Sequence, residues 1–176
     1  MKNFCISFLA CIIIILLAIC LMLPTQQVKT EYLRIHIRAN SNMEIDQKIK
    51  YSVKTAVVEF LTPFVAQCTT KQSAEKMLKN NISSIEQVAN EVLKNNGFSY
   101  KSSASVKSEN FPTRAYQNLT LDGGFYDALI INLGSGNGDN WWCVVYPPLC
   151  FVENASGYVY TSKIYNIIND FFKRNK

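Results

Sequence analysis

A long apolar segment at the N-terminus restricts the fold of this chain more than any other feature. Residues 4–23 contain one frankly polar side chain, that of Ser7, and the first charged residue after them is Lys29. Because ~20 helical residues span the ~30 Å hydrocarbon core of a bilayer, the segment is long enough to cross a membrane. A helix without a polar face does not fit on the surface of a globular domain. We therefore expect an apolar helix within residues 1–24 that carries the rest of the chain across a membrane.

The apolar segment can act as a cleaved signal sequence or as an uncleaved membrane anchor. It is longer than the ~7–15 residues of most signal-peptide apolar cores, and no Ala-x-Ala pattern follows it. Both observations favour the anchor. The run Leu-Ala-Ile-Cys is similar to a lipoprotein box, but the bulky Ile19 stands where a small residue is expected. The sequence leaves the signal sequence and the anchor open.

Residues 25–176 form the expected extracytoplasmic domain, and about 150 residues are enough to bury a hydrophobic core. The whole chain has a formal net charge of +5, and its basic residues form no block longer than Lys173-Arg174. Proteins that bind nucleic acids usually gather Lys and Arg on one face, so nucleic acid is not an expected partner. A mildly basic surface suits a location beside an anionic membrane or cell wall.

Three of the six cysteines, Cys68, Cys143 and Cys150, fall in the exported domain. Disulfides form outside the cytoplasm, and a Cys143–Cys150 bond would close a short loop that contains Pro147 and Pro148. Two free buried thiols are the alternative, and the sequence leaves both open. A single histidine and no Cys-x-x-Cys pair do not supply the ligands of a usual zinc site. We expect neither a metal nor another cofactor.

The exported domain begins with the pattern of a strand. Apolar and polar side chains alternate over residues 32–38, which predicts a strand with one buried face and one exposed face. The expected exposed face consists of Tyr32, Arg34, His36 and Arg38.

Two helices are predicted after this strand. A Ser41-x-x-Glu44 capping box starts the first helix. Its apolar stripe begins at Ile45, and Pro63 is expected to end it. The second helix begins with another capping box, Thr-x-x-Gln at 69–72, and ends before the glycine of an Asn-Asn-Gly sequence. The short link between them predicts an antiparallel helical hairpin.

The second half of the domain is predicted to supply the rest of a sheet. Strand patterns cover 98–107, 128–133 and 143–146, and the glycine-rich run 134–140 reads as a long hairpin turn between the last two. A final amphipathic helix is expected from Thr161. The predicted fold class is therefore α+β: one mainly antiparallel sheet with the helical hairpin packed on one face and a C-terminal helix, preceded by the apolar N-terminal helix.

The sequence contains few candidates for catalytic groups. The glycine-rich turn lacks the Lys-Ser/Thr ending of a phosphate-binding loop. His36 and Cys143 could form a base and thiol nucleophile, as in an exported thiol-dependent enzyme or cell-wall hydrolase. That chemistry requires a lowered thiol pKa and contact between the two side chains. No carboxylate pair stands out from the aspartates of the turns, so we do not expect an enzyme.

Aromatic residues and prolines gather in two stretches, and this clustering favours a binding surface. One stretch contains both tryptophans, Trp141 and Trp142, and the other is 111–116, Phe-Pro-Thr-Arg-Ala-Tyr. Large rings can simply complete the hydrophobic core. Trp, Tyr and Arg also dominate the energetic hot spots of protein interfaces, because they bury a large area with few rotatable bonds.

Several sequence motifs together resemble those of a known family. They are Arg38-Ala39-Asn40-Ser41 before Asp46-Gln47, Phe111-Pro112-Thr113, Asp127-Ala128-Leu129, and Gly134-x-Gly136-x-Gly138-x-Asn140-Trp141-Trp142-Cys143-x-x-x-Pro147-Pro148-Leu149-Cys150. In order and spacing over residues 33–152, they resemble the stage II sporulation protein R family of endospore-forming bacteria. The last block is long and rich in rare residues, which makes a chance match improbable.

This resemblance implies a signalling role. Family members are exported from the forespore into the space between the two membranes of the sporulating cell. There they activate a membrane-embedded aspartic protease of the mother-cell membrane, which processes a sigma-factor precursor. The resemblance does not say which side chains touch the protease. Our candidates for partner binding are Arg38, Asn40, Phe111, Arg114, Tyr116, Trp141 and Trp142.

Overall fold

The computed structural model describes residues 8–9, 11–15, 28–116, 119–152 and 158–175, with the backbone alone for 28–30 and 158–161. The predicted apolar helix and its boundary at residue 24 fall mostly outside these ranges, although 8–9 and 11–15 are helical. Among the described residues, no helix combines the length and apolar character needed to cross a membrane. The elements are β1 (Val28–Arg38), α2 (Glu44–Val65), α3 (Lys71–Asn80), α4 (Ile82–Asn95), β2 (Ser102–Phe111), β3 (Arg114–Tyr116), β4 (Leu119–Leu121), β5 (Gly124–Leu133), β6 (Asn140–Tyr146), η1 (Leu149–Phe151) and α5 (Tyr158–Arg174).

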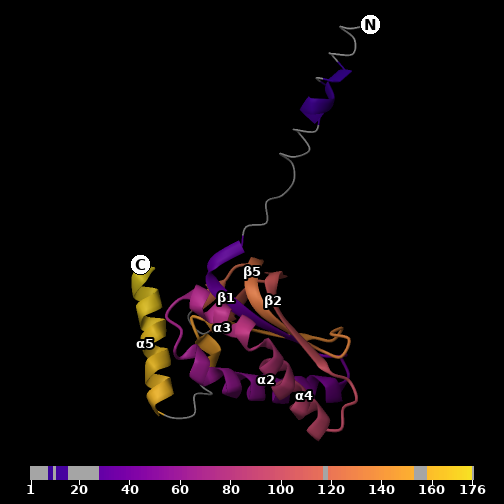
Figure 1. Cartoon of the computed structure of the whole chain (residues 1–176), viewed down its shortest axis with the longest axis vertical. Coiled ribbons are helices and arrows are strands. Elements are labelled where there is room, and N and C mark those ends of the chain that lie inside the picture. Colours follow the sequence, from indigo (N-terminus) through magenta and orange to yellow (C-terminus); the bar gives the residue numbers. More distant parts are fainter. Residues whose placement is uncertain (1–7, 10, 16–27, 117–118, 153–157, 176) are drawn as a thin grey trace.

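The fold is α+β and is built on one four-stranded sheet with the order β2-β5-β1-β6 (Figure 1). β2 pairs antiparallel with β5, and β1 pairs antiparallel with β6. The central pair, β1 and β5, is parallel. The sheet is therefore mixed but mainly antiparallel, as the sequence predicted, because two of its three strand pairings are antiparallel. The parallel pair was not foreseen because periodicity identifies strands without saying which of them are neighbours.

The glycine-rich run between β5 and β6 is not a hairpin turn, which corrects the prediction. β1 lies between these two strands, so the connection has to cross the end of β1. There the N–H of Gly138 donates to the carbonyl of Ala39 at 2.8 Å, and the N–H of Asn137 donates to that of Asn40 at 3.3 Å. Backbone therefore runs directly against backbone, which explains the need for small residues.

Three helices, α2, α3 and α4, cover one face of the sheet in place of the predicted hairpin. The second predicted helix is broken at Asn81, and its capping box is formed by Thr70 and Ser73 instead of residues 69–72. α2 continues through Pro63 to Val65, so this proline does not end it.

The predicted capping box at the start of α2 is also absent. Met43 is the N-cap and makes no side-chain cap bond. The hydroxyl of Ser41 instead donates to Asp46. Ile45 does not belong to the apolar stripe either, because 59% of it is exposed.

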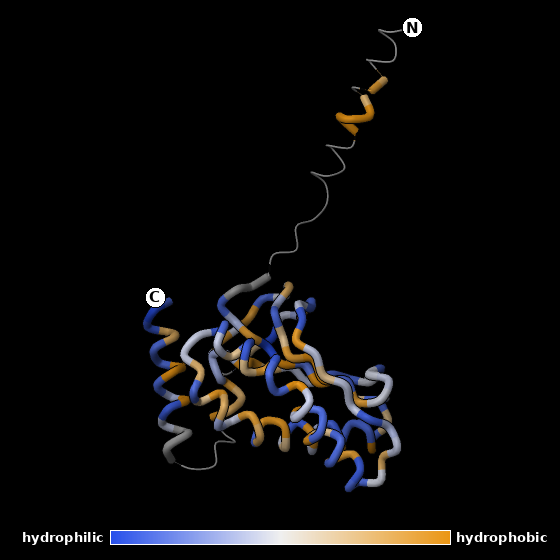
Figure 2. The backbone as a smooth tube through the Cα atoms, in the orientation of Figure 1, coloured by the Kyte–Doolittle hydropathy of each residue, from blue (hydrophilic) through white to orange (hydrophobic). Residues whose placement is uncertain are grey.

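The main hydrophobic core lies between the three helices and this face of the sheet (Figure 2). Leu33, Ile35 and Ile37 of β1 are fully buried in it, as the alternation predicted. α5 packs at the side of the domain, where Phe171 lies 5.5 Å from the ring of Tyr32. We name the helix-covered face the helical face and the opposite one the second face.

The second face is also covered, which the sequence did not predict. It carries a smaller hydrophobic cluster that draws on β2, β4, β5 and β6 and includes Phe111, Leu121 and Tyr126. The short strands β3 and β4 form a separate two-stranded sheet. The side chains of Arg34 and His36, expected at an exposed face, are therefore buried beneath this layer.

Candidate partner-binding surface

Arg34 is the most unusual side chain of the second face. It has 0% exposure, and its guanidinium lies 4.2 Å from the ring of Phe111 and 4.7 Å from that of Tyr126. Nη2 donates to the hydroxyl of Tyr116 at 2.7 Å. Nε and Nη1 have no hydrogen-bond partner among the described residues. The rings provide cation–π attraction, but no described carboxylate forms an ion pair with this buried charge.

His36 occupies the next position along the same face and is 4% exposed. Its ring stacks on Trp142 with a centroid distance of 5.3 Å. Burial lowers the pKa of His36 to about 4; Asn140 opposes this fall, whereas Arg38, Arg34 and Lys107 add to it. His36 is therefore neutral at physiological pH. Oδ1 of Asn140 and both ring nitrogens of His36 nevertheless lack a well-aligned hydrogen bond within the described part of the chain.

Glu109 connects the histidine to the rim of the second face. Its Oε1 forms an ion pair with Arg38, whose Nη1 also donates to Asn132 at 3.3 Å. Its Oε2 lies 3.4 Å from Nδ1 of His36 but is not hydrogen bonded. Burial is the largest cause of the lowered pKa of His36, and the nearby carboxylate of Glu109 does not reverse it.

These side chains form one group, which we call the second-face cluster. It consists of Arg34, His36, Arg38, Glu109, Phe111, Tyr116, Tyr126 and Trp142. Buried polar atoms are usually hydrogen bonded, and each one left unpaired costs ~1–3 kcal/mol. The several unpaired atoms of this cluster therefore make it costly for the stability of the domain.

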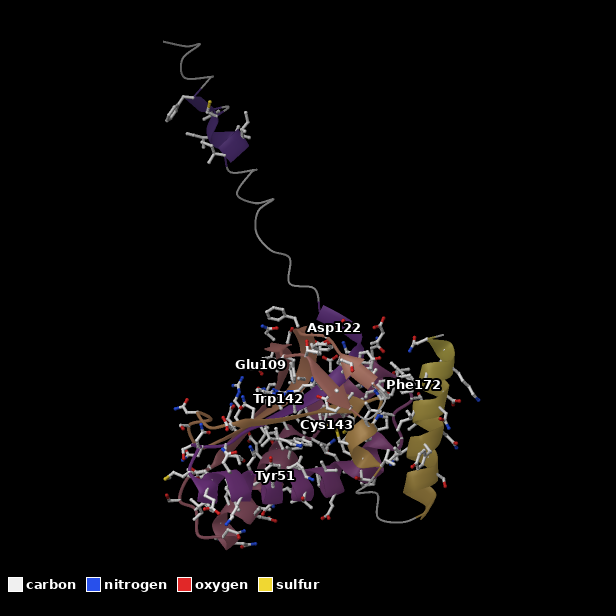
Figure 3. All side chains as sticks on the ribbon, turned by 180° about the vertical axis from the view of Figure 1, so that it is seen from behind. Tyr51, Glu109, Asp122, Trp142, Cys143 and Phe172 are labelled. Atoms are coloured by element: carbon white, nitrogen blue, oxygen red, sulfur yellow. A yellow bond between two sulfur atoms is a disulfide. The ribbon has the colours of Figure 1, made fainter. Side chains whose placement is uncertain are left out.

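At its exposed rim the cluster ends in a cation–tryptophan pair. The exposed Arg114 of β3 places its guanidinium 4.1 Å from the ring of Trp142 on β6. In Figure 3, Trp142 lies on the side of Glu109, away from Tyr51 of α2. An exposed arginine stacked on a half-buried tryptophan has the composition of an interface hot spot.

Trp141 lies on the opposite side of the sheet from its neighbour, because successive side chains of a strand point to opposite faces. It packs against the main core, and Nζ of Lys54 lies 5.9 Å from its ring. The two tryptophans therefore do not form one aromatic cluster. Each pairs with a cation on its own face.

Asn40 belongs to a different group, which we call the Asp46 network. The buried carboxylate of Asp46 accepts hydrogen bonds from Asn40 at 3.0 Å, Ser41 at 2.6 Å and Tyr100 at 2.6 Å. Burial alone would raise the pKa of Asp46, but the hydrogen bonds from Ser41, Tyr100 and Asn40 hold it below its usual value. The amide oxygen of Asn40 in turn accepts from the backbone N–H of Ser135 at 3.0 Å.

The glycines of the crossing connection are part of this network. A Cβ on Gly138 would come closer than 3.0 Å to the backbone of Ser41, and one on Gly134 would meet the side chain of Asn40 equally closely. Gly134 also has a φ of 57°, which glycine adopts most readily. The Arg-Ala-Asn-Ser motif and the Gly-x-Gly-x-Gly motif thus interlock with each other, and this geometry explains their spacing.

The thiol–histidine pair is excluded by the geometry. Cys143 is bonded to Cys150 in a disulfide, and its side chain belongs to the main core on the helical face. His36 lies on the second face, where it contacts Trp142 and Phe111. Strand alternation, which sequence reasoning did not apply to this pair, separates the two groups. Nor do three His, Cys, Asp or Glu side chains gather as possible metal ligands within the described ranges.

The structure brings together five of the predicted partner-binding residues and separates two. Those on the second face are Arg38, Phe111, Arg114, Tyr116 and Trp142. Asn40 lies in the Asp46 network, and Trp141 faces the helices. Arg34, Glu109 and Tyr126 were missed. The sequence did contain a signal for them. Arg34, His36 and Arg38 alternate along one strand, and the later aromatic stretch 111–116 needs an apolar surface on which to pack.

Comparisons with known proteins agree with the resemblance seen in the motifs. The model of the family described as stage II sporulation protein R matches residues 29–156. A curated relative from Bacillus subtilis (strain 168), named stage II sporulation protein R, is 34% identical over 125 residues. That alignment covers 71% of this chain and 56% of the relative, so the chain spans little more than half of the relative's length. No solved structure matches the chain.

Proposed function

The chain belongs to the stage II sporulation protein R family, and we propose that it is an exported signal that activates a membrane-embedded protease during sporulation. In this proposal the protease is an aspartic protease of the mother-cell membrane. Its activation triggers processing of the precursor of a mother-cell sigma factor. The role in sporulation follows from the family, and the remaining steps are the proposal.

The structural observation that carries the proposal is the pair of the exposed Arg114 and the half-buried Trp142 at the rim of the second-face cluster. On the same face, nitrogen atoms of the buried Arg34 and His36 have no hydrogen-bond partner in the part of the chain that the structure describes. A protein that only had to be stable would gain from apolar residues at such positions. The second face keeps these buried polar groups although they lower the stability of the domain. Its rim ends in an arginine and a tryptophan, so the face is suited to contact another protein.

Binding would activate the protease by shifting a conformational equilibrium. A ligand changes such an equilibrium only by its different affinities for the two states. We propose that the second face binds the outward-facing part of the protease more tightly in its active or dimeric state. The signal then supplies contacts and needs no catalytic group of its own.

The proposed location is the space between the forespore and mother-cell membranes. The apolar segment 4–23 would direct export and would then be removed or stay as an anchor in the membrane of the producing cell. The receptor faces the same space from the opposite membrane.

Co-production in a host that does not sporulate tests this function. The chain, its presumed protease and the sigma-factor precursor are expressed together, and cleavage of the precursor is followed by immunoblotting. We expect cleavage with the full chain and none with a version lacking residues 1–23. Arg114→Ala and Trp142→Ala should reduce cleavage by at least about tenfold, as expected for hot-spot residues. Lys94→Ala, on an exposed position of α4, is the matched control.

Absence of cleavage with all three proteins present and correctly located would overturn the proposal. So would full cleavage by the version that cannot leave the cytoplasm. A competing function as a thiol-dependent hydrolase has no structural support, because the thiol of Cys143 is bonded to Cys150.

A further inference from the structure

Among the described residues, β6 is an edge strand of the four-stranded sheet, and we call its outer side the open edge. It pairs with β1 on one side, and no described strand pairs with it on the other. The N–H of Val144 points outward, because it donates to Sγ of Cys150 at 3.1 Å. Hydrogen-bonding direction alternates from residue to residue along a strand, so the backbone groups of Asn140 and Trp142 point outward as well. η1 lies against β6, where Sγ of its Cys150 meets Val144. Asn140 and Trp142, further toward the start of the strand, are half-buried.

Both sides of this open edge carry the same arrangement of a cation and an indole ring. On the second face the guanidinium of Arg114 lies over Trp142, and on the helical face the ammonium of Lys54 lies near Trp141. Two positive charges and two large rings therefore flank the open edge of β6. Asp139 is the residue just before this edge, so its negative charge lies at one end of it. Burial lowers the pKa of the nearby Lys50, and the carboxylate of Asp139 partly opposes that fall.

We infer that the open edge of β6 receives an extended acidic segment of the partner as an additional strand. The backbone of this segment pairs with the outward N–H and C=O groups of Asn140 and Trp142. Successive side chains of this segment point to opposite faces of the sheet, so two adjacent carboxylates meet Arg114 on one face and Lys54 on the other. The inference rests on the proposed function, because it assigns the chemistry of the protease segment that contacts the signal.

An acidic strand fits this edge better than a neutral or basic one. A free edge by itself attracts any extended chain, and natural proteins protect such edges with charges. Here the flanking charges are positive and lie over tryptophans, so they repel basic segments and attract acidic ones. Acidic side chains are expected beside Trp142 and Trp141 and not beside Asp139, whose own charge would oppose them.

The first experiment uses the two tryptophans as reporters, since they are the only two in the chain and both lie at the proposed site. The full chain in detergent micelles is titrated with a short synthetic peptide in which pairs of glutamates alternate with pairs of valines, so that glutamates fall on both faces of the added strand. A lysine–valine peptide serves as the control ligand. We expect a saturable change in tryptophan emission with the glutamate peptide only. An equal response to both peptides, or no saturable response, would overturn the inference.

Charge reversal tests the two cations. Lys54→Glu combined with Arg114→Glu should weaken binding of the glutamate peptide by about a hundredfold, or about tenfold for each cation. Lys94→Glu changes the net charge at an exposed position of α4 and should leave the affinity unchanged. Unchanged affinity in the double variant contradicts the assignment of Lys54 and Arg114.

A proline substitution tests the backbone pairing. Asn140→Pro removes the outward N–H without removing a bond to β1, and proline is tolerated at the first residue of an edge strand. We expect about a tenfold loss of peptide affinity for Asn140→Pro and little change for Asn140→Ala. Equal affinity in both variants contradicts strand addition. If Asn140→Pro does not fold, the peptide affinity of the Lys54→Glu, Arg114→Glu variant decides whether the inference stands.

The processing assay separates this inference from the proposed function. If the glutamate peptide binds as expected but the wild-type chain triggers no precursor cleavage, the proposed function fails and the edge site remains. If cleavage occurs and is unaffected by Lys54→Glu alone, the function remains and the edge site fails, because Lys54 belongs to the edge site and not to the second face.

Discussion

The Asp46 network and the second-face cluster are two buried polar groups in one small domain, and they differ in how completely they are hydrogen bonded. Asp46 accepts three side-chain hydrogen bonds, and Asn40 connects it to the crossing connection. In the second-face cluster, atoms of Arg34, His36 and Glu109 remain unpaired among the described residues. A completed network stabilises a fold, whereas an incomplete one costs stability and suggests a role in binding.

The conspicuous sequence motifs and the candidate binding surface therefore lie in different parts of the molecule. The Arg-Ala-Asn-Ser and Gly-x-Gly-x-Gly motifs are prominent in the sequence, yet their residues serve mainly to join the end of β1 to the β5–β6 connection. Arg34 and Glu109, which carry unpaired polar atoms among the described residues of the second face, belong to no conspicuous motif. The predictions below test whether the two groups differ in stability as their hydrogen bonds indicate.

Removing the carboxylate of Asp46 should have the largest effect. Asp46→Ala leaves the half-buried donors of Asn40, Ser41 and Tyr100 without their acceptor, so we expect a loss of about 4 kcal/mol in the free energy of unfolding. Asp46→Asn keeps the shape and one acceptor and should cost less. Denaturant unfolding followed by circular dichroism measures both. A loss below about 1 kcal/mol for Asp46→Ala would mean that the network is not structural.

Acidification should act on the second-face cluster. Burial lowers the pKa of His36 from its ordinary value of 6.5 to about 4, so the unfolded chain binds a proton in this range that the folded chain does not. Stability is therefore lost as the pH falls from 6.5 to 4, by about 3 kcal/mol for this group. Unfolding measured between pH 7 and pH 4 for the wild type and for His36→Gln gives the contribution. The neighbouring charged groups of Glu109, Arg38, Arg34 and Lys107 are the same in the wild type and the variant. An identical pH dependence of the two proteins would therefore contradict the assignment to His36.

A methyl group on Gly138 tests the crossing connection. Its Cβ would press on the backbone of Ser41, so we expect Gly138→Ala to cost about 2 kcal/mol. Gly97→Ala is the matched control: Gly97 has a φ of 81° but no atom within 4 Å of an added Cβ. It should cost about 1 kcal/mol from backbone strain alone. A smaller loss at Gly138 than at Gly97 would mean that close backbone approach does not determine this position.

The smallest effect is expected for Arg34. Arg34→Met replaces an incompletely paired buried cation with an apolar chain of similar length, so the free energy of unfolding should change by less than about 1 kcal/mol or rise. Tyr116→Phe, which removes the hydroxyl that accepts from Nη2, is the companion variant. A loss of several kcal/mol in Arg34→Met would place Arg34 with Asp46 among the structural residues.

Sequence reasoning found most elements but not the relations between them. The alternation in β1 correctly placed Leu33, Ile35 and Ile37 in the core, because strand periodicity reports directly which side chains share a face. It misplaced Arg34 and His36, because polarity predicts exposure unless a second layer covers the face. That layer comes from Phe111, β3, β4 and β5, which lie far away in the sequence.

The sequence by itself determined the apolar N-terminal run, the α+β class, the apolar faces of the main helices and the family. These properties depend on local patterns, since periodicity and motif spacing are written along the chain. The tertiary structure decided the parallel β1–β5 pair, the crossing of the connection over β1, the separation of Trp141 from Trp142 and the burial of Arg34. Each of these depends on which distant segments meet, and the free energy of such long-range packing has no local signature in the sequence.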